Sequence, residues 1–179
     1  MTDVAELERP TIRPESAADI AAIANLTRRA FDKTNGEEVQ MVADFRARAD
    51  FISELSLVAE LGGMVVGHVI TVPSILRGDE GNTERPRRVL LLGPLSVMPE
   101  FQRRGMGGQL LRRTLEVVAC RPDLSGSAPM IVLWGHSDYY PRFGFCPARE
   151  FGLRPDFLAA MVYPLWADLS EYAGLELPD

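Results

Sequence analysis

A chain of 179 residues with 46% hydrophobic and 25% charged residues is ordinary for one globular domain with a single core, so we do not expect a second full domain. Its formal net charge of −6 argues against duplex DNA or an anionic membrane as the main partner, because both are bound through clustered positive charge. The acidic N-terminus lacks the apolar stretch of a signal peptide, and no apolar run approaches the ~18 residues of a spanning helix, so we expect a cytoplasmic protein.

The first third of the chain predicts a short strand, two helices and a hairpin. Ser16 followed by Asp19 is typical of a helix N-cap, and apolar residues then recur at helical spacing. An Asn-Gly pair interrupts this pattern before a second amphipathic run begins. The period then changes to that of strands, with a two-glycine turn between runs rich in β-branched residues. In chain order we expect a strand at 11–14, helices over about 16–32 and around 39–49, and hairpin strands at 57–60 and 64–75.

A polar segment at residues 77–88 follows the hairpin and has no apolar periodicity, so we expect it to be a mobile loop. The next strand, at 89–97, contains Pro94. Proline cannot donate a hydrogen bond to a neighbouring strand, so this strand is expected to kink or splay at that position. A glycine-rich loop at 102–108 comes next and opens an amphipathic helix, whose single apolar face is typical of packing on a sheet.

The glycine-rich loop has the composition of a phosphate-binding site. A strand, a glycine loop and a helix follow one another without a break, so backbone N–H groups and the positive end of the helix dipole meet at one point. Glycine lets a pyrophosphate come closer to the backbone than a Cβ would permit. Arg103 and Arg104 add charged donors for the same anion. The loop therefore predicts a phosphate-bearing ligand.

The last third of the chain mixes short strands with short helices and ends in an acidic tail. Hairpin-linked strands together with a single βαβ unit indicate the α+β class with a mixed sheet. Cys120 and Cys146 have the spacing of neither a disulfide framework nor a metal site. In chain order we expect a strand at 130–134, a brief helix at 137–143, an extended segment at 145–148 and a strand at 157–165.

Two segments resemble the Gcn5-related N-acetyltransferase (GNAT) superfamily. Residues 95–107, LSVMPEFQRRGMG, are similar to the family's strand and its Gln/Arg-x-x-Gly-x-Gly/Ala acyl-CoA loop. Residues 139–145, YYPRFGF, are similar to the family's late Tyr-x-x-x-Gly-Phe segment. This second segment, with FGLRP at 151–155, resembles the YhbS-like predicted acetyltransferases. The resemblance implies the three-layer α/β/α acyl-CoA N-acyltransferase fold, with a mostly antiparallel, splayed sheet.

The same resemblance implies an N-acetyltransferase that moves an acetyl group from acetyl-CoA to a primary amine of a small molecule or peptide, without a metal. One domain is expected at 10–166, with extensions at 1–9 and 167–179. Family members often pair C-terminal strands across subunits, which allows a homodimer. Tyr140 matches the acid that protonates the departing thiolate, and the ordinary tyrosine pKa of ~10 lies near that of a thiol. The residues matched to acyl-CoA binding are Leu95, Val97, Gln102, Arg103, Arg104, Gly105, Met106, Gly107 and Gly108.

No general base can be carried over from the resemblance, because this chain has Leu-Gly-Pro at 92–94 where some relatives carry a carboxylate. Glu60, His68 and Asp138 stay open as bases, acting directly or through water. An amine of lowered pKa would need none of them. His68 lies in an apolar strand, which favours a buried structural histidine over a base.

Two other functions stay open. Residues 135–139, GHSDY, follow a buried strand as the nucleophile elbow of an α/β-hydrolase does, which would make Ser137 a nucleophile. Tyr139 replaces the glycine that closes this turn, and no histidine follows the serine as that fold requires, so we disfavour it. The missing strand carboxylate supports a different alternative, a non-catalytic acyl-CoA sensor. No motif identifies the acceptor.

Overall fold

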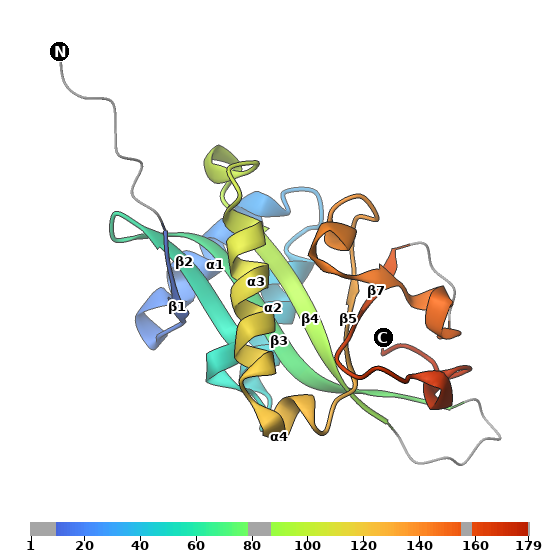
Figure 1. The fold of residues 1–179 in the computed structure, drawn as a ribbon. Helices are drawn as coiled ribbons and strands as arrows, with labels where there is room; N and C mark the ends of the chain where they lie inside the picture. The colour runs from blue at the N-terminus through green and yellow to red at the C-terminus, as the bar shows by residue number, and fades with distance from the viewer. Residues whose placement is uncertain (1–9, 79–86, 155–158, 179) are drawn as a thin grey trace. The chain divides into compact units, whose positions relative to one another are not determined.

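The computed structural model describes residues 10–78, 87–154 and 159–178. Their strands form a seven-stranded sheet in the order β1 (Thr11–Pro14), β2 (Ser56–Leu61), β3 (Met64–Leu76), β4 (Arg87–Val97), β5 (Met130–Trp134), β7 (Ala160–Pro164) and β6 (Cys146–Pro147). Figure 1 labels each of these strands except β6. β4 and β5 pair in parallel, whereas β1 with β2, β2 with β3, β5 with β7 and β6 with β7 are antiparallel. The predicted α+β class with a mixed, mostly antiparallel sheet is confirmed.

The described residues group into two compact units. The first contains the residues up to Ile70 together with Pro94–Thr114, and the second contains Thr71–Gly93 together with the residues from Leu115 onward. No helix in the described ranges combines the length and the apolar character that crossing a bilayer requires. The helices are α1 (Ile20–Ala30), α2 (Glu37–Ala47), α3 (Met106–Ala119) and α4 (Pro122–Ser125), and 3-10 turns lie at Ala17–Asp19, Ser53–Leu55, Pro99–Phe101, Tyr140–Phe143, Ala148–Phe151 and Ser170–Tyr172.

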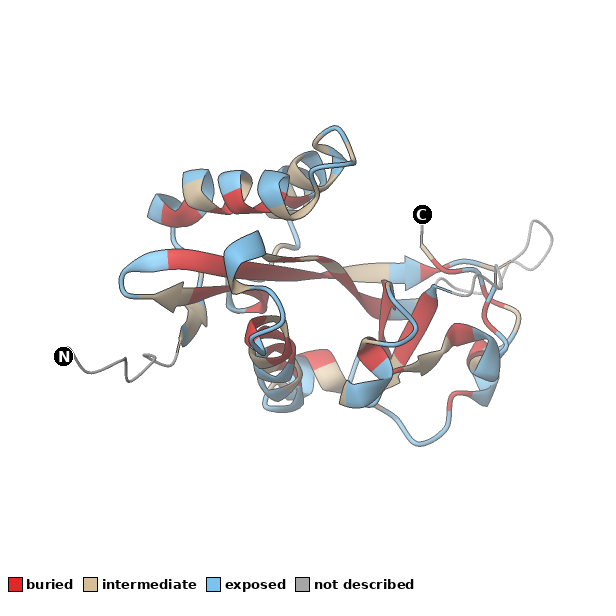
Figure 2. Ribbon diagram, turned by 90° about the horizontal axis from the view of Figure 1, so that it is seen from above, coloured by how far each residue is buried: buried red, intermediate tan, exposed pale blue. Residues whose placement is uncertain are grey.

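In the first unit, the part of β3 up to Ile70 is covered on both faces. Every residue from Val65 to Ile70 is buried, although successive side chains of a strand point to opposite faces. Figure 2 shows the reason, because α1 and α2 lie on one side of the strands and α3 lies on the other. A strand covered on both faces has a nearly continuous apolar sequence, which is the pattern of these residues.

Helix α3 packs directly against Gly67 of β3. A Cβ on this glycine would lie 3.0 Å from Cδ1 of Leu110 and 3.4 Å from the carbonyl oxygen of Ser96. Leu110 and Leu111 on the same helix are fully buried. The missing side chain at position 67 therefore lets the helix approach the sheet, and this packing fixes the loop that opens the helix.

The predicted N-cap of the first helix is confirmed, but the helix begins with a 3-10 turn. The carboxylate of Asp19 accepts hydrogen bonds from the backbone N–H of Ser16 at 2.7 Å and from its Oγ at 2.8 Å. Regular α-helix starts at Ile20 and ends at Ala30 rather than at about residue 32. Phe31 terminates it because its backbone, with φ −119° and ψ 54°, leaves the helical region.

In the second unit, β5 lies between β4 and β7. Among the described residues, β4 and β5 pair at Leu90 with Ile131 and at Leu91 with Val132. β5 goes on pairing with β7 to its last residue. The β4–β5 ladder therefore stops before Pro94, in agreement with the predicted splay, although β4 itself continues through the proline.

The C-terminal segment expected as an extension contributes buried residues to the second unit. The N–H of Arg77 donates to the carbonyl oxygen of Glu176 at 3.1 Å, and the N–H of Glu176 donates back to Arg77 at 2.7 Å. Strand-like pairing thus continues past the end of β3. The buried residues of this segment are Leu169, Tyr172, Leu175 and Leu177.

The other predicted elements differ from the structure mainly at their ends. The brief helix expected at 137–143 is a single 3-10 turn, because Pro141 has no N–H to donate and Gly144, at φ 92°, ends the turn. The helix expected around 39–49 is α2, and the strand expected at 57–60 is β2. The segment expected at 145–148 shortens to β6, the strand expected at 157–165 is β7, and residues 79–86 of the expected loop and 157–158 of that strand lie outside the described residues.

We expect Gly67→Val to lower the free energy of unfolding by about 2 kcal/mol, because the added methyl groups overlap the side chain of Leu110 and the backbone of Ser96. Denaturant unfolding measures this change. Gly67→Ala is the matched control and costs less, since its Cβ meets the movable end of a leucine side chain. Equal stability of Gly67→Val and wild type would contradict the close packing.

Candidate functional site

The glycine-rich loop begins where β4 ends, and hydrogen bonds hold its start. The N–H of Met98 donates to the carbonyl oxygen of Val66 on β3 at 2.9 Å. The side-chain amide of Gln102 donates to the carbonyl oxygen of Val97 at 3.0 Å. The first bond ties the chain to β3 just before the 3-10 turn Pro99–Phe101, and the second ties it to β4 just after that turn.

Two residues of the loop have left-handed backbone conformations. Gly105 has φ 82°, which glycine adopts without strain. Arg103 has φ 59°, which costs a residue with a Cβ about 1 to 3 kcal/mol. Strain of this kind persists only where the surrounding structure imposes it, and it gathers at ligand-binding segments. The side chains of Arg103 and Arg104 are exposed, and the Arg104 guanidinium lies 5.7 Å from the ring centre of Phe101.

The start of α3 leaves backbone amides without helical partners. The N–H of Gln109 donates to the carbonyl oxygen of Gly105 at 3.0 Å. The preceding N–H groups, of Met106, Gly107 and Gly108, therefore have no acceptor within the helix, and the positive end of its dipole adds to them. A Cβ built on Gly105 would meet no atom within 4 Å. The space beside Gly105 is therefore open, as an anion near these amides requires.

The last residues of β4 lead straight into this loop. Leu95 and Val97 are half-buried and share one face of the strand. Ser96, between them, points to α1, where its Oγ donates to Oγ1 of Thr27 at 3.2 Å. The first unit thus brings together all the residues predicted for acyl-CoA binding, from Leu95 to Gly108.

Tyr140, the predicted acid, belongs to the second unit and follows β5. Its side chain is buried, with 8% of the residue exposed. The ring meets Tyr139 edge-on at 5.1 Å between ring centres, and Phe145 at 5.6 Å. Burial raises the pKa of Tyr140 to about 12, and the neighbouring Tyr139 acts in the same direction. The hydroxyl therefore stays protonated at neutral pH.

The surroundings of Ser137 do not form a nucleophile elbow. Ser137 lies in a turn and is exposed, as are His136 and Asp138 on either side of it. The other histidine of the chain, His68, is fully buried in the first unit. Nε2 of His68 lies against Ser56 and Glu15, and no hydrogen bond between a histidine and Ser137 occurs among the described residues, so the hydrolase alternative loses its geometric basis.

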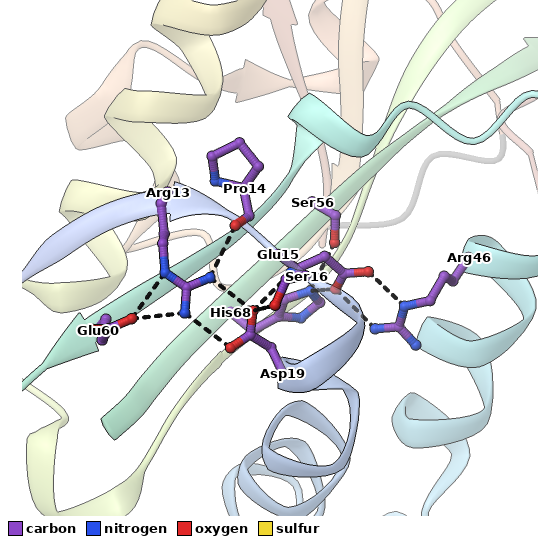
Figure 3. Close-up of polar contacts among 9 residues, drawn as sticks. All are labelled: Arg13, Pro14, Glu15, Ser16, Asp19, Arg46, Ser56, Glu60 and His68. Atoms are coloured by element: carbon purple, nitrogen blue, oxygen red, sulfur yellow. Dashed lines mark hydrogen bonds and ion pairs between the residues drawn. The ribbon is translucent and has the colours of Figure 1, made fainter. Parts of the chain in front are cut away.

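Glu60, one of the residues left open as a base, is engaged in an ion pair. Nε and Nη2 of Arg13 donate to its Oε2 at 2.9 and 2.7 Å, as Figure 3 shows. The same guanidinium donates to both oxygens of Asp19, at 2.7 and 2.9 Å, and lowers the pKa of that carboxyl. One arginine thus joins β1, β2 and the start of α1, which gives Glu60 a structural role.

His68 is enclosed beside a second ion pair (Figure 3). Its Nε2 lies 3.0 Å from Oγ of Ser56 and 3.3 Å from Oε2 of Glu15. Arg46 of α2 donates to both oxygens of Glu15, at 2.6 and 2.9 Å. Burial lowers the pKa of His68 more than Glu15 raises it, so the ring is neutral. Serine and glutamate both contact the same nitrogen, whereas a triad histidine uses opposite nitrogens, so this group activates no nucleophile.

Sequence reasoning missed the Glu15–Arg46 pair and could not have found it. The two residues are 31 positions apart, and neither belongs to a motif. In the sequence, Gly135 belongs only to the Gly-x-Ser turn, whereas in the structure its hydrogen atom faces the Tyr140 ring. No spacing rule signals either contact, because both depend on how separate elements pack.

Known proteins are similar to this chain in both sequence and fold. A family model described as "Acetyltransferase (GNAT) domain" matches residues 11–148. YjhQ of Escherichia coli (strain K12), named an uncharacterized N-acetyltransferase, is 33% identical over 130 residues, which span 73% of this chain and 66% of YjhQ, just under two thirds of its length. A GNAT family acetyltransferase from Brucella melitensis, solved in complex with acetyl-CoA, is 32% identical with a TM-score of 0.69 over 89% of this chain and 90% of that one. YhbS from Escherichia coli, solved in complex with CoA, is 27% identical with a TM-score of 0.75 over 99% and 93%.

The Glu15–Arg46 pair makes stability depend on pH. Burial alone would raise the pKa of Glu15, but hydrogen bonds from Arg46 and His68 outweigh burial and lower it to about 2, from 4.5. The lowered pKa contributes stability that is fully present above pH 4.5 and is lost as the pH falls toward 2. We expect Glu15→Gln to lower the free energy of unfolding by about 3 kcal/mol at pH 7, because the half-buried Arg46 loses the charged partner whose pKa it lowers.

Thermal unfolding from neutral to acidic pH measures this difference, which should shrink as the pH drops below 4.5. Glu150→Gln, at an exposed position, is the matched control and should follow the wild type throughout. A difference that stays constant down to the lowest pH would contradict the linkage.

Proposed function

Because the chain belongs to the GNAT acetyltransferase family, we propose that it transfers an acetyl group from acetyl-CoA to a primary amine by direct attack. The amine nitrogen bonds to the acetyl carbon, the carbon–sulfur bond breaks, and CoA leaves as a thiol. The proton that the amine loses balances the proton that the sulfur gains. The observation that carries the proposal is the open glycine loop at the start of α3, with its left-handed residues Arg103 and Gly105.

We propose that the backbone amides from Gln102 to Gly107 bind the pyrophosphate, with Gly108 lining the start of the helix. Three features support this assignment: the N–H groups of Met106 and Gly107 without helical acceptors, the open space at Gly105, and two exposed arginine side chains. The N–H of Gln102 already donates to the carbonyl oxygen of Pro99, at 3.3 Å. Backbone donors at a helix N-terminus and guanidinium groups are the usual ligands of a phosphate anion. The residues present therefore fit the group.

The end of β4 is proposed to hold the acyl arm. In this proposal the main chain of Val97 pairs with the pantetheine arm as a neighbouring strand would, and amides from Leu95 to Val97 polarise the thioester carbonyl. The carbonyl oxygen of Val97 already accepts the Gln102 side chain, and its second lone pair remains for an N–H of the arm. The ladder between β4 and β5 also stops before Pro94, so it does not use these groups.

Tyr140 is proposed to give its proton, or a hydrogen bond, to the departing sulfur. With a pKa of about 12, its hydroxyl is protonated whenever the amine attacks. The same low-dielectric surroundings that disfavour a phenolate also disfavour a bare thiolate, so an O–H donor is worth more to the sulfur than it would be in water.

No side chain is proposed as the base. Glu60 is paired with Arg13, and His68 is fully buried and neutral. We propose that the acceptor amine reacts in its neutral form and passes its proton to water. The net charge of −6 favours the approach of a cationic amine, and small molecules and peptide termini both fit this description.

We expect wild-type protein to bind acetyl-CoA with a dissociation constant in the micromolar range, and Gly105→Glu to weaken binding about 100-fold or more. The reason is that the new carboxylate enters the space where the phosphate is proposed to lie and repels it. Calorimetric titration measures both affinities. Gly63→Glu is the matched control, since Gly63 has a similar backbone, φ 79°, and equally open space, but lies in the turn between β2 and β3.

The same affinity for Gly105→Glu and Gly63→Glu would contradict the proposed phosphate position. An intact protein that binds no acetyl-CoA would overturn the proposed function.

We expect Tyr140→Phe to keep the affinity for acetyl-CoA within about twofold and to lower turnover about 100-fold, which is the usual contribution of a general acid. Release of the CoA thiol is followed with a polyamine, an aminoglycoside and a peptide with a free N-terminus as acceptors. Tyr163→Phe is the control, because its ring packs on Phe145 in the same aromatic group.

Full turnover by Tyr140→Phe would assign the proton to another donor. Tight acetyl-CoA binding without turnover of any amine by wild type would favour the non-catalytic sensor.

A further inference from the structure

Gly135 occupies a fixed position between β5 and the turn that carries Tyr140. Its N–H donates to the carbonyl oxygen of Ala159 at 2.8 Å, which extends the pairing of β5 with the chain leading into β7. The backbone of Gly135 is therefore held in place on one side. Its φ lies outside the left-handed region, so its conformation alone does not require glycine.

The ring of Tyr140 lies directly against the Cα of Gly135. A Cβ built there would stand 2.1 Å from Cε2 and 2.8 Å from Cδ2 of Tyr140, and 3.1 Å from Cδ1 of Leu133. Carbon atoms that are not bonded do not approach to 2.1 Å, so any side chain at position 135 must displace the ring. The space taken by the ring is the physical reason for glycine at this position.

Two other aromatic rings contact the Tyr140 ring. Tyr139 stands perpendicular to the Tyr140 ring, and Phe145 meets it in a T-shaped contact. Phe145 is itself held by Tyr163, at 5.3 Å between ring centres. Phe145 is fully buried, so the protein interior is already filled on that side of the ring, and we expect a ring displaced from Gly135 to become more exposed.

We propose that Gly135 is a positioning residue for Tyr140: the absence of a side chain at 135 sets the place and depth of the phenol. This inference rests on the proposed role of Tyr140 as the proton donor for its consequence in turnover. It also gives the Gly-x-Ser sequence at 135–137 a function unrelated to a serine nucleophile. Gly135 does not touch the reacting atoms and acts only through the ring.

The test follows the Tyr140 phenol itself in protein labelled with ¹³C at the ζ carbon of tyrosine. Four tyrosine signals are expected, and Tyr140→Phe identifies the one that belongs to Tyr140. In wild type this signal should still have the chemical shift of an un-ionised phenol at about pH 10.5, where an ordinary tyrosine is more than half ionised. In Gly135→Ala the ring is displaced toward water, and the chemical shift of this signal should change with a midpoint near the ordinary tyrosine pKa of about 10.

Gly126→Ala is the matched control. A Cβ at Gly126 would lie 2.5 Å from the carbonyl oxygen of Pro122, so this variant also carries a severe overlap in the second unit, but with backbone instead of the Tyr140 ring. It should lose stability and leave the Tyr140 signal unchanged. A Tyr140 signal that Gly135→Ala leaves at its wild-type ionisation would overturn the proposal.

Stability provides a second readout that needs no activity. Gly135→Ala should lower the melting temperature of the wild type by about 5 °C, through overpacking. In a Tyr140→Ala background the ring is gone, and the same substitution should cost less than about 1 °C. An equal loss in both backgrounds would show that position 135 clashes with something other than Tyr140, and the proposal would fail.

Turnover separates this inference from the proposed function. Gly135→Ala should lower turnover about tenfold or more with acetyl-CoA affinity unchanged, and Gly135→Ala combined with Tyr140→Phe should turn over at the rate of Tyr140→Phe alone. If the double variant loses turnover by the product of the two single losses, the two residues act independently and the assignment is overturned. If Tyr140→Phe alone leaves turnover intact, the acid role fails, while the ¹³C signal and the melting temperatures still decide whether Gly135 positions the ring.

Discussion

Two neighbouring residues of β3 hold both ends of the glycine-rich loop, and the proposed phosphate site depends on them. The carbonyl oxygen of Val66 accepts the N–H of Met98 just before the loop. Gly67, the next residue, accommodates Leu110 on the helix just after it. The loop therefore spans two fixed points on one buried strand. Helix amides attract an anion only where their position is fixed, and this strand supplies the fixed frame.

Glycine serves two different physical purposes in this chain. At Gly105 the backbone is left-handed and the surroundings are empty, so glycine supplies a conformation and room for a ligand. At Gly67 and Gly135 the backbone is ordinary and the surroundings are full, so glycine supplies contact between the main chain and another side chain. The two kinds respond differently to substitution, because the first kind disturbs the loop itself and the second displaces the neighbour that packs against it.

The parts of the fold that were predicted correctly depend on local patterns. The hairpin of β2 and β3, the strand β5 and the strand–loop–helix order around Gly105 all follow from apolar periodicity and turn residues within a short window. The resemblance to GNAT proteins rested on two such windows, and the family was confirmed. The helix expected at 137–143 was wrong in type because Pro141 and Gly144 limit it to one turn.

What could not be predicted depends on residues that are far apart in sequence. Arg13 and Glu60 are 47 positions apart, and their pairing decides that one candidate base is structural. The burial of His68 needs α1 and α2 on one side of β3 and α3 on the other, which no local pattern of that strand contains. The depth of Tyr140 likewise depends on Gly135 and Phe145. The roles assigned to the loop residues and to Tyr140 stay predictions, since geometry alone does not test them.

The charged groups of the first unit determine which residues could take up or release a proton in the proposed reaction. Buried carboxylates at Glu15 and Asp19 are satisfied by arginines, so their charges serve the junction of β1, α1 and α2. The groups proposed at the loop are backbone amides and two exposed guanidinium groups, and burial raises the pKa of Tyr140 to about 12. Tyr140, the proposed proton donor, therefore keeps its hydroxyl proton from about pH 6 to 9. Any dependence of transfer on pH in that range belongs to the acceptor, whose amine must lose its proton before its lone pair can attack.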